Sequence, residues 1–280
     1  MNRLVVFDLD DTLFLERDYV RSGFRAVGDS VRRRLGVKGF FNAAWKRFES
    51  GERSLIFDRV LADRGVLPGR PLVRELLSVY RTHVPRVKLC PDALRFLARC
   101  PEGVAIGVIT DGRLPAQRAK VRALGLDRLV GDIVITGRWG TRFAKPHPRA
   151  YLWMERRFGL RGPACTYVGD NPAKDFQAPL SLGWSVFRVR RSGGLYGEVP
   201  SPGVPEIQSC EELRRLVRPV SGAATGSSGA IPGTAPPPRP GVRTRISSPS
   251  RPAETGRVRN PGRLERHRPM PASPRLRSRA

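Results

Sequence analysis

Acidic, hydroxyl and basic side chains lie at or beyond the ends of short apolar segments in four separate parts of this 280-residue chain. The residues concerned are Asp8, Asp10, Thr110, Asp111, Lys145, Asp170 and Asp175. Carboxylates from two such segments can together hold a magnesium ion, which prefers oxygen ligands and keeps several waters. A carboxylate neutralised by a metal can attack phosphorus as a nucleophile. A second carboxylate two residues later, which is the spacing of Asp8 and Asp10, can protonate the leaving oxygen and then activate water.

Groups that can balance negative charge complete the set. Thr110, Lys145 and the backbone amides that follow the strand-end acids can neutralise a transferring phosphoryl group. The segment Asp111-Gly112 would supply such amides, so both residues are candidate phosphate-binding positions. No His, Ser or Cys constellation competes with this arrangement. The three histidines are scattered along the chain and are expected to be structural or solvated: His83, His147 and His267.

Each candidate also has an ordinary structural interpretation. An aspartate at a strand end, such as Asp8 or Asp10, can be a turn residue or a helix N-cap. The Thr110 segment has the composition of a turn. Lys145 alone would be a surface lysine, and Asp175 alone could be a helix-start acid favoured by the helix dipole. The presence of all of them in one chain favours a functional site.

The elements that must position these residues can be read from the apolar pattern. Runs typical of strands buried on both faces occur at 4–7, 104–109, 133–135, 165–168 and 185–189. Helical patterns occur at 92–99, 116–124, 148–158 and 210–217. Strands that alternate with helices predict an α/β fold with a parallel sheet. Ligands bind beyond the carboxyl ends of the strands in such a sheet, where the candidate residues would meet.

A long helical block interrupts this alternation directly after the first strand. Residues 16–85 show helical spacing and no convincing strand, so we expect a helical cap over 16–85 inserted into a core formed by 1–15 and 86–218. Residues 219–280 are rich in Arg, Pro, Gly and Ser and are predicted to be a disordered tail. Within the cap, Arg53 lies between two helices and is a candidate substrate-selecting residue.

Four motifs carry a resemblance to a known family. In chain order they are Asp8-Leu9-Asp10-Asp11-Thr12, Thr110-Asp111-Gly112, Lys145-Pro146 and Gly169-Asp170-Asn171-Pro172-Ala173-Lys174-Asp175. Together they resemble the ordered motifs of the haloacid dehalogenase-like (HAD) hydrolase superfamily, over about residues 3–217. The resemblance implies a Rossmann-like core. The position of the helical block resembles the subclass with a small helical cap between the first and second motifs.

The resemblance also implies roles for individual residues. Asp8 would be the nucleophile and Asp10 the general acid and base. Thr110 and Lys145 would hold the phosphoryl group. Magnesium would be bound by Asp8, the backbone carbonyl of Asp10 and Asp170, and Asp175 would support the metal site directly or through water. An acid at position 10 points away from the dehalogenase and phosphonate-cleaving branches, which lack it.

These inferences converge on one function with two alternatives. The leading interpretation is a magnesium-dependent phosphomonoester hydrolase that acts on a small phosphorylated metabolite, such as a sugar phosphate or nucleotide, through an aspartyl-phosphate on Asp8. A phosphomutase of the same superfamily would use Asp8 and Asp10 likewise. A nucleic-acid-binding protein that works through the basic tail is the alternative from another class.

Composition limits the remaining possibilities. Lys and Arg number 51 against 25 Asp and Glu, a net charge of +26, of which residues 218–280 carry +11. Because arginine is scattered over every segment, we interpret the excess as a compositional bias and expect no specific nucleic-acid partner. Four cysteines without a CxxC pair predict reduced thiols. No apolar run approaches the roughly 20 residues of a membrane span, so we expect a cytoplasmic protein with no membrane partner. We expect it to be a monomer or a homodimer.

Overall fold

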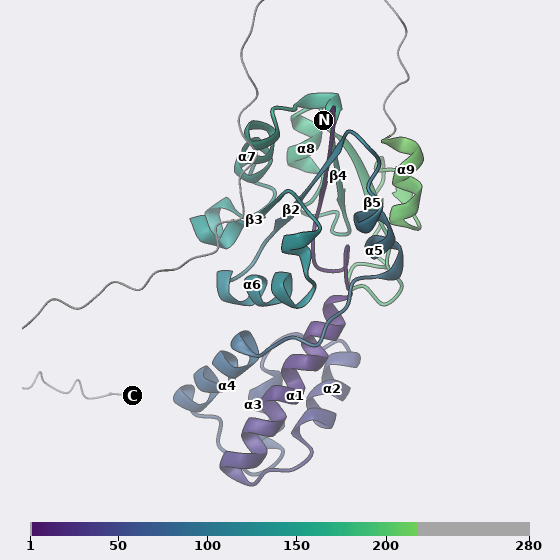
Figure 1. Ribbon diagram of the computed structural model, residues 1–280. Helices are drawn as coiled ribbons and strands as arrows, with labels where there is room; N and C mark the ends of the chain where they lie inside the picture. The colour runs from purple at the N-terminus through teal and green to yellow at the C-terminus, as the bar shows by residue number, and fades with distance from the viewer. Residues whose placement is uncertain (1, 218–280) are drawn as a thin grey trace, which may run out of the picture. The chain divides into compact units, whose positions relative to one another are not determined.

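A computed structural model describes residues 2–217 of the chain (Figure 1). The predicted tail over 219–280 lies outside the described residues. The described part contains a single parallel sheet with the strand order β3-β2-β1-β4-β5-β6. Its strands are β1 (Arg3–Phe7), β2 (Val104–Thr110), β3 (Asp132–Ile135), β4 (Cys165–Gly169), β5 (Ser185–Val189) and β6 (Glu206–Ile207). The predicted α/β class and its five strands are confirmed, whereas β6 was missed because two residues show no periodicity.

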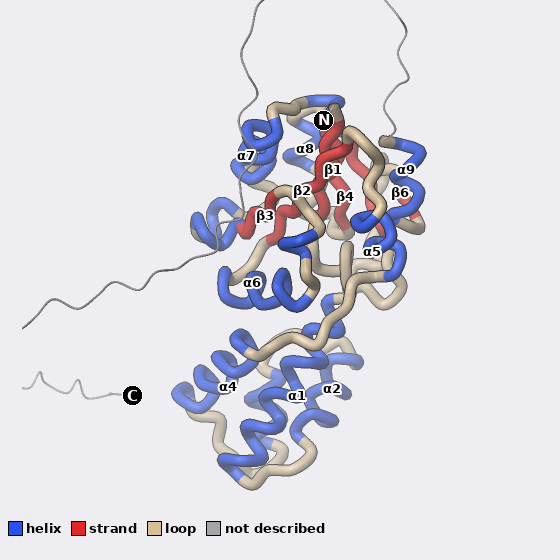
Figure 2. The backbone as a smooth tube through the Cα atoms, in the orientation of Figure 1, coloured by secondary structure: helices blue, strands red, loops and turns tan. Residues whose placement is uncertain are grey.

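Helices cover both faces of the sheet (Figure 2). Successive side chains of β1 point to opposite faces, so Val5 and Phe7 join one apolar cluster while Leu4 and Val6 join another. The first cluster includes residues of α5 (Pro91–Ala98), α6 (Leu114–Ala123) and α9 (Leu213–Leu216). The second includes residues of α7 (Arg149–Phe158) and α8 (Gln177–Ser181). Burial on both faces explains why the strands are continuous apolar runs.

The block after β1 is helical, as its spacing predicted. It contains α1 (Glu16–Leu35), α2 (Phe40–Glu49), α3 (Ile56–Ala62) and α4 (Arg70–Thr82). These helices enclose an apolar cluster of their own, which includes Phe24, Phe40, Phe57, Leu61 and Leu76. We use the term cap for these four helices and their connections. Acids in the first turn of α1 and three arginines in its last turn complement the helix dipole.

Short 3₁₀ turns fill the connections in the core. They span Leu126–Arg128, Thr136–Trp139, Thr141–Phe143, Gly162–Ala164 and Cys210–Glu212. The last of these replaces the first part of the helix predicted over 210–217, because Ser209 and Glu212 form a capping box there. The two turns after β3 carry the chain to Lys145.

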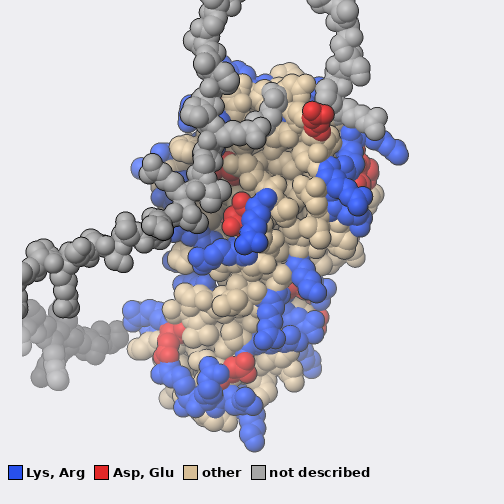
Figure 3. All heavy atoms as spheres, viewed as in Figure 1, with Lys and Arg blue, Asp and Glu red and all other residues tan. Residues whose placement is uncertain are grey.

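Charge is distributed over the described surface in several groups. On the face drawn in Figure 3, Lys and Arg side chains occur in separate groups with Asp and Glu among them. The four cysteines are free thiols, as predicted. Among residues 2–217, no helix combines the length and the apolar character that crossing a membrane requires.

Candidate active site

The register of the three central strands brings the first, second and fourth motifs to one edge of the sheet. Phe7 pairs with Val108 on one side and with Val168 on the other. The next residue, Asp8, is 3% exposed, and its backbone N–H donates to the Val168 carbonyl at 2.8 Å. Thr110 and Asp170 leave the neighbouring strands at the same level and are also buried. Parallel pairing thus gathers residues that are about 160 positions apart in the chain.

Lys145 enters this edge from the loop after β3. Its side chain is fully buried, and its Nζ donates to Asp8 Oδ1, to Asp175 Oδ1 at 2.6 Å and to the Tyr167 hydroxyl at 3.0 Å. Burial opposes the positive charge, but the carboxylates of Asp175 and Asp8 outweigh it and hold the pKa of Lys145 well above its ordinary value. The lysine therefore stays charged next to the carboxylate that the sequence marks as the nucleophile.

Three of the carboxylates predicted to serve the metal lie together. Oxygen atoms of Asp8, Asp170 and Asp175 lie within 4.8 Å of one another, and all three residues are buried. Burial raises the pKa of Asp8 to about 7 and the pKa of Asp170 to about 9, and the neighbouring carboxylates add to both shifts. A buried set of oxygen donors that repel one another is the environment a hard divalent cation relieves.

Asp175 depends on a glycine for its place in this cluster. A Cβ atom on Gly169 would lie 2.5 Å from Asp175 Oδ2, which is closer than non-bonded atoms approach. That same carboxylate oxygen accepts from the Asn171 backbone N–H at 2.9 Å. The Tyr167 hydroxyl donates to the other oxygen at 3.3 Å. Asp175 is therefore fixed by the loop that follows β4.

Asp10 faces a different group of residues. Its carboxylate accepts from Lys120 Nζ at 2.5 Å and from Gln117 Nε2 at 2.8 Å, and its side chain is 21% exposed. The carboxylate therefore lies beside the three-carboxylate cluster and outside it. The family resemblance assigns the backbone carbonyl of Asp10, and not its carboxylate, to the metal. The position of the carboxylate does not test that role, which stays a prediction.

Gln117 and Lys120 were not singled out from the sequence. Both are nearly inaccessible to solvent, and Lys120 Nζ lies 4.2 Å from the centre of the Tyr19 ring in the cap. The carboxylates of Asp10 and Glu16 raise the pKa of Lys120 against the opposing effect of burial. The available signal was their spacing. Two polar residues three positions apart on the helix behind the Thr110 motif share one face, which points at the strand ends.

The second motif is held by two side chains and one backbone amide, which come from three segments. Gln117 Nε2 donates to Thr110 Oγ1 at 2.7 Å, while the amide oxygen of Gln117 has no partner among the described residues. Asp111 accepts from Thr136 Oγ1 at 2.7 Å and from the Lys145 backbone N–H at 3.1 Å. The Asp111 carboxylate thus joins the loops after β2 and β3. Gly112 follows with a φ of 127°, a conformation that favours glycine.

Asp11, the third acid of the first motif, connects the cap to the core. It adopts a left-handed φ of 52°, which aspartate tolerates better than most residues. Its carboxylate accepts from the backbone N–H groups of Glu16, at the start of α1, and Leu195, both at 2.8 Å. Burial, followed by the charge of Asp10, raises the pKa of Glu16 to about 7. Glu16 is therefore a further acid beside the site that the sequence did not reveal.

A cavity of about 290 Å³ opens onto these residues. Its lining includes Asp8, Asp10, Asp111, Gly112 and Asp170 together with Glu16, Tyr80, Gln117, Lys120 and Lys174. These five predicted residues of the first, second and fourth motifs thus share one space. Thr110, Lys145 and Asp175 do not line it, although Lys145 and Asp175 lie against Asp8. Arg53 does not line this cavity and contacts a second one in the cap.

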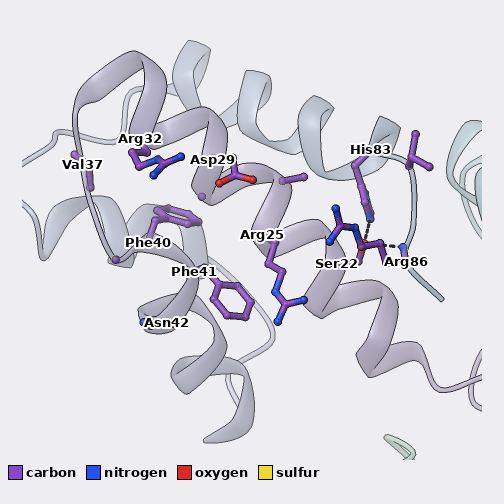
Figure 4. Close-up of a pocket in the computed structure, with 14 residues that line it drawn as sticks. Ser22, Arg25, Asp29, Arg32, Val37, Phe40, Phe41, Asn42, His83 and Arg86 are labelled. Carbon is purple, nitrogen blue, oxygen red and sulfur yellow. Dashed lines mark hydrogen bonds between the residues drawn. The ribbon is translucent and has the colours of Figure 1, made fainter.

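A larger cavity, of about 490 Å³, lies elsewhere on the cap (Figure 4). Arg25, Arg32 and Arg86 line it, and the Ser22 hydroxyl there contacts the His83 ring at 3.0 Å and accepts from the Arg86 backbone N–H at 2.9 Å. It shares no lining residue with the cavity at Asp8. The cavity at which the predicted residues gather is therefore not distinguished by its size.

Comparison with known proteins assigns the chain to a family. Residues 2–183, more than half of the chain, match the model of the haloacid dehalogenase-like hydrolase family. The chain therefore belongs to this family, and the protein is a hydrolase. The resemblance predicted from the four motifs is confirmed.

Several curated relatives and solved structures are similar to most of the chain. It is 28% identical to a glyceraldehyde 3-phosphate phosphatase of Methanopyrus kandleri, over 78% of this chain and 98% of that protein. It is 26% identical to the protein of the same name from Methanocaldococcus jannaschii, over 76% and 96%. A magnesium-bound HAD hydrolase from Bacillus subtilis superposes with a TM-score of 0.56 at 18% identity, over 77% of this chain and 98% of that chain. A subfamily IA hydrolase from Geobacter sulfurreducens gives 0.56 at 16% identity, over 77% and 96%. The two structures show the same fold.

Proposed function

We propose that this protein is a magnesium-dependent phosphomonoester hydrolase that forms an aspartyl-phosphate on Asp8. The carrying observation is that the Asp8 carboxylate is held by Lys145 at the floor of a cavity that Asp10 also lines. The curated relatives named as phosphatases support a phosphate ester as the substrate. A small phosphorylated metabolite fits a cavity of about 290 Å³, close to the lower end of the range of ligand sites.

In the first step, a carboxylate oxygen of Asp8 attacks phosphorus and the bond from phosphorus to the ester oxygen breaks. Asp10 gives its proton to that oxygen, so the alcohol leaves neutral. Thr110, Lys145 and the backbone amides after the second motif balance the charge of the transferring group. The aspartyl-phosphate on Asp8 then remains on the enzyme.

In the second step, Asp10 takes a proton from water, which attacks phosphorus. The bond from phosphorus to Asp8 breaks, inorganic phosphate leaves and the Asp8 carboxylate is regenerated. Lys120 and Gln117 hold the Asp10 carboxylate from the side of α6, so they would position it for both proton transfers. We propose them as positioning residues.

Magnesium fits the donor set on this edge. Asp8, Asp170 and the backbone carbonyl of Asp10 would hold the ion, and Asp175 would support it. The fit rests on three buried carboxylates whose oxygens lie within 4.8 Å of one another, a hard-oxygen set of the kind magnesium prefers. When bound, the ion supplies positive charge that offsets the repulsion between the Asp8 carboxylate and a phosphate ester.

Phosphate release from a panel of sugar phosphates, nucleotides and alkyl phosphates tests the proposal, measured with magnesium and with EDTA. We expect release that depends on magnesium and is lost in Asp8→Asn. Product analysis distinguishes a phosphomutase, which would return the phosphoryl group to a sugar and release no inorganic phosphate. Full activity in EDTA, or in Asp8→Asn, would contradict the mechanism.

A further inference from the structure

The cap contains an apolar cavity that adjoins the candidate active site. It measures about 380 Å³ and is lined by side chains that include Phe24, Phe48, Phe57, Val73 and Leu77. Glu16 and Tyr80 line both this cavity and the cavity at Asp8. The two spaces therefore adjoin at these two residues. We call this second space the cap cavity.

We propose that the cap cavity binds the alcohol half of the substrate and that this half is apolar, such as an alkyl or aryl group. The inference rests on the proposed phosphatase function and names the substrate class of that same site. The cavity volume lies within the range of about 300–1,000 Å³ that ligand pockets occupy, and such pockets are predominantly apolar.

The shared wall is fixed by close packing. Tyr80 lies against α1 at a glycine, since a Cβ atom on Gly23 would approach the Tyr80 ring to 2.5 Å. The Tyr80 ring also makes edge contacts with Tyr19 at 5.5 Å and with Phe57 at 5.9 Å between ring centres. A side chain held from three directions forms a fixed wall, so the two cavities adjoin at Tyr80 as a property of the fold.

The core contributes to the cap cavity as well. Leu195 lines it, and the backbone N–H of Leu195 donates to Asp11 Oδ2 at 2.8 Å. Asp11 in turn lies in the first motif, three residues after the nucleophile. The apolar wall is therefore tied by one hydrogen bond to the loop that carries Asp8 and Asp10.

Two residues between α2 and α3 fit an apolar ligand. Leu55 lines the cavity with a left-handed φ of 55° although it is 62% exposed. Backbone outliers of this kind are costly for an apolar residue and cluster at ligand sites. The Arg53 guanidinium lies 4.2 Å from the centre of the Phe48 ring and donates to the Phe48 and Glu52 carbonyls at 2.6 and 2.9 Å. The Arg53 guanidinium at the cap cavity is thus already held by groups of the protein.

A homologous series of n-alkyl phosphates, from ethyl to octyl, tests the inference on the intact chain with magnesium. These esters have the same leaving-group chemistry, so differences in kcat/KM report binding of the chain. We expect kcat/KM to rise about fourfold for each buried methylene until the cavity is filled. A flat series, or glyceraldehyde 3-phosphate preferred tenfold over n-propyl phosphate, would overturn the apolar subsite and leave the phosphatase function intact.

Matched variants locate the effect. Leu77→Trp fills the cap cavity and should lower kcat/KM for octyl phosphate at least tenfold, with ethyl phosphate unchanged. Val73→Phe is a second, milder filling variant in case the first disturbs the cap. Leu67→Trp introduces the same ring at a residue that is 92% exposed and should change neither substrate. Equal losses on both esters in both filling variants would contradict the assignment.

Binding of non-hydrolysable n-alkyl phosphonates by calorimetry separates the two proposals. If no ester is hydrolysed, the proposed function fails. Octylphosphonate that then binds at least tenfold more tightly than ethylphosphonate, and loses this advantage in Leu77→Trp, would still support the apolar subsite. Equal affinities would overturn it.

Discussion

The strand-end site and the cap cavity adjoin at Glu16 and Tyr80 but are built from opposite kinds of side chain. At the strand ends, carboxylates and lysines are buried against one another, and their pKa values shift as a result. In the cap, aromatic and aliphatic side chains surround a space with few polar groups. The first arrangement suits the movement of charge, and the second suits the recognition of shape and apolar area. This division predicts that substitutions can alter the proposed reaction and the proposed substrate selection separately.

Replacing Asp8, the proposed nucleophile, should give the largest effect and should not depend on the cap. Asp8→Asn keeps the shape of the side chain but removes the charge that would attack phosphorus. We expect kcat to fall by at least about 10⁴-fold for every substrate, as for other catalytic nucleophiles. Steady-state phosphate release measures it. Asp127→Asn, at an exposed position, is the matched control and should keep full activity.

Removing Lys120 should give the next largest effect, again on the reaction side. Lys120→Met keeps the length of the side chain but takes the charged partner from Asp10, whose proton transfers are worth about 10²–10⁴-fold in rate. We expect kcat for alkyl phosphates to fall about 100-fold. The loss should be smaller for p-nitrophenyl phosphate, whose leaving group needs less protonation.

Arg118 provides the control for Lys120, because it lies on the same helix and is exposed. Arg118→Met should leave both substrates unaffected. If Lys120→Met lowers kcat equally for alkyl and p-nitrophenyl phosphates and leaves the pH profile unchanged, Lys120 has a structural role and does not position Asp10.

On the selection side, Arg53→Ala should have a smaller and substrate-dependent effect. The change removes a guanidinium that covers the Phe48 ring, a contact worth about 0.5–1 kcal/mol at an exposed site. We expect kcat/KM for octyl phosphate to fall about threefold while ethyl phosphate is unchanged. Arg74→Ala, an exposed cap arginine, is the control. An unchanged ratio of the two substrates would remove Arg53 from the recognition of substrate.

The smallest effect concerns stability in the absence of metal. The pKa of Asp8, Glu16 and Asp170 is raised in the folded state to about 7, 7 and 9. Above about pH 4 these carboxyl groups lose their protons in the unfolded chain but keep them in the folded state. Because the folded state then binds more protons, the free energy of unfolding falls as pH rises. We expect Tm in EDTA to decrease by about 5 °C or more between pH 5 and pH 9.

Magnesium should oppose this trend, because it replaces the bound protons with a metal charge. Added magnesium should thus raise Tm more at pH 9 than at pH 5, as followed by circular dichroism. An equal gain at both pH values would mean that the three-carboxylate cluster is not where the ion acts.

The two regions also differ in what the sequence reveals. Asp8 and Asp170 could be selected as candidates because each follows an apolar strand within a set of four ordered motifs, and parallel pairing places both at the carboxyl end of the sheet. Gln117 and Lys120 escaped notice because polar residues on a helix usually face solvent. Only the tertiary structure shows that this helix turns them inward.

The cap cavity could not be predicted for a related reason. Phe57 and Leu77 have the composition and spacing of ordinary core residues. A side chain that packs against a neighbour and one that borders a cavity are indistinguishable in sequence. Arg53 was selected because it lies between helices, and the structure places it at the cap cavity.

Gly169 has a consequence for how this chain can diverge over generations. Any side chain at that position would collide with the Asp175 carboxylate, which in turn holds Lys145. A change at 169 is therefore tolerated only together with a shorter residue at 175, and that second change removes a partner of the buried lysine. Positions 169 and 175 should therefore covary, so that related sequences keep both residues or change both.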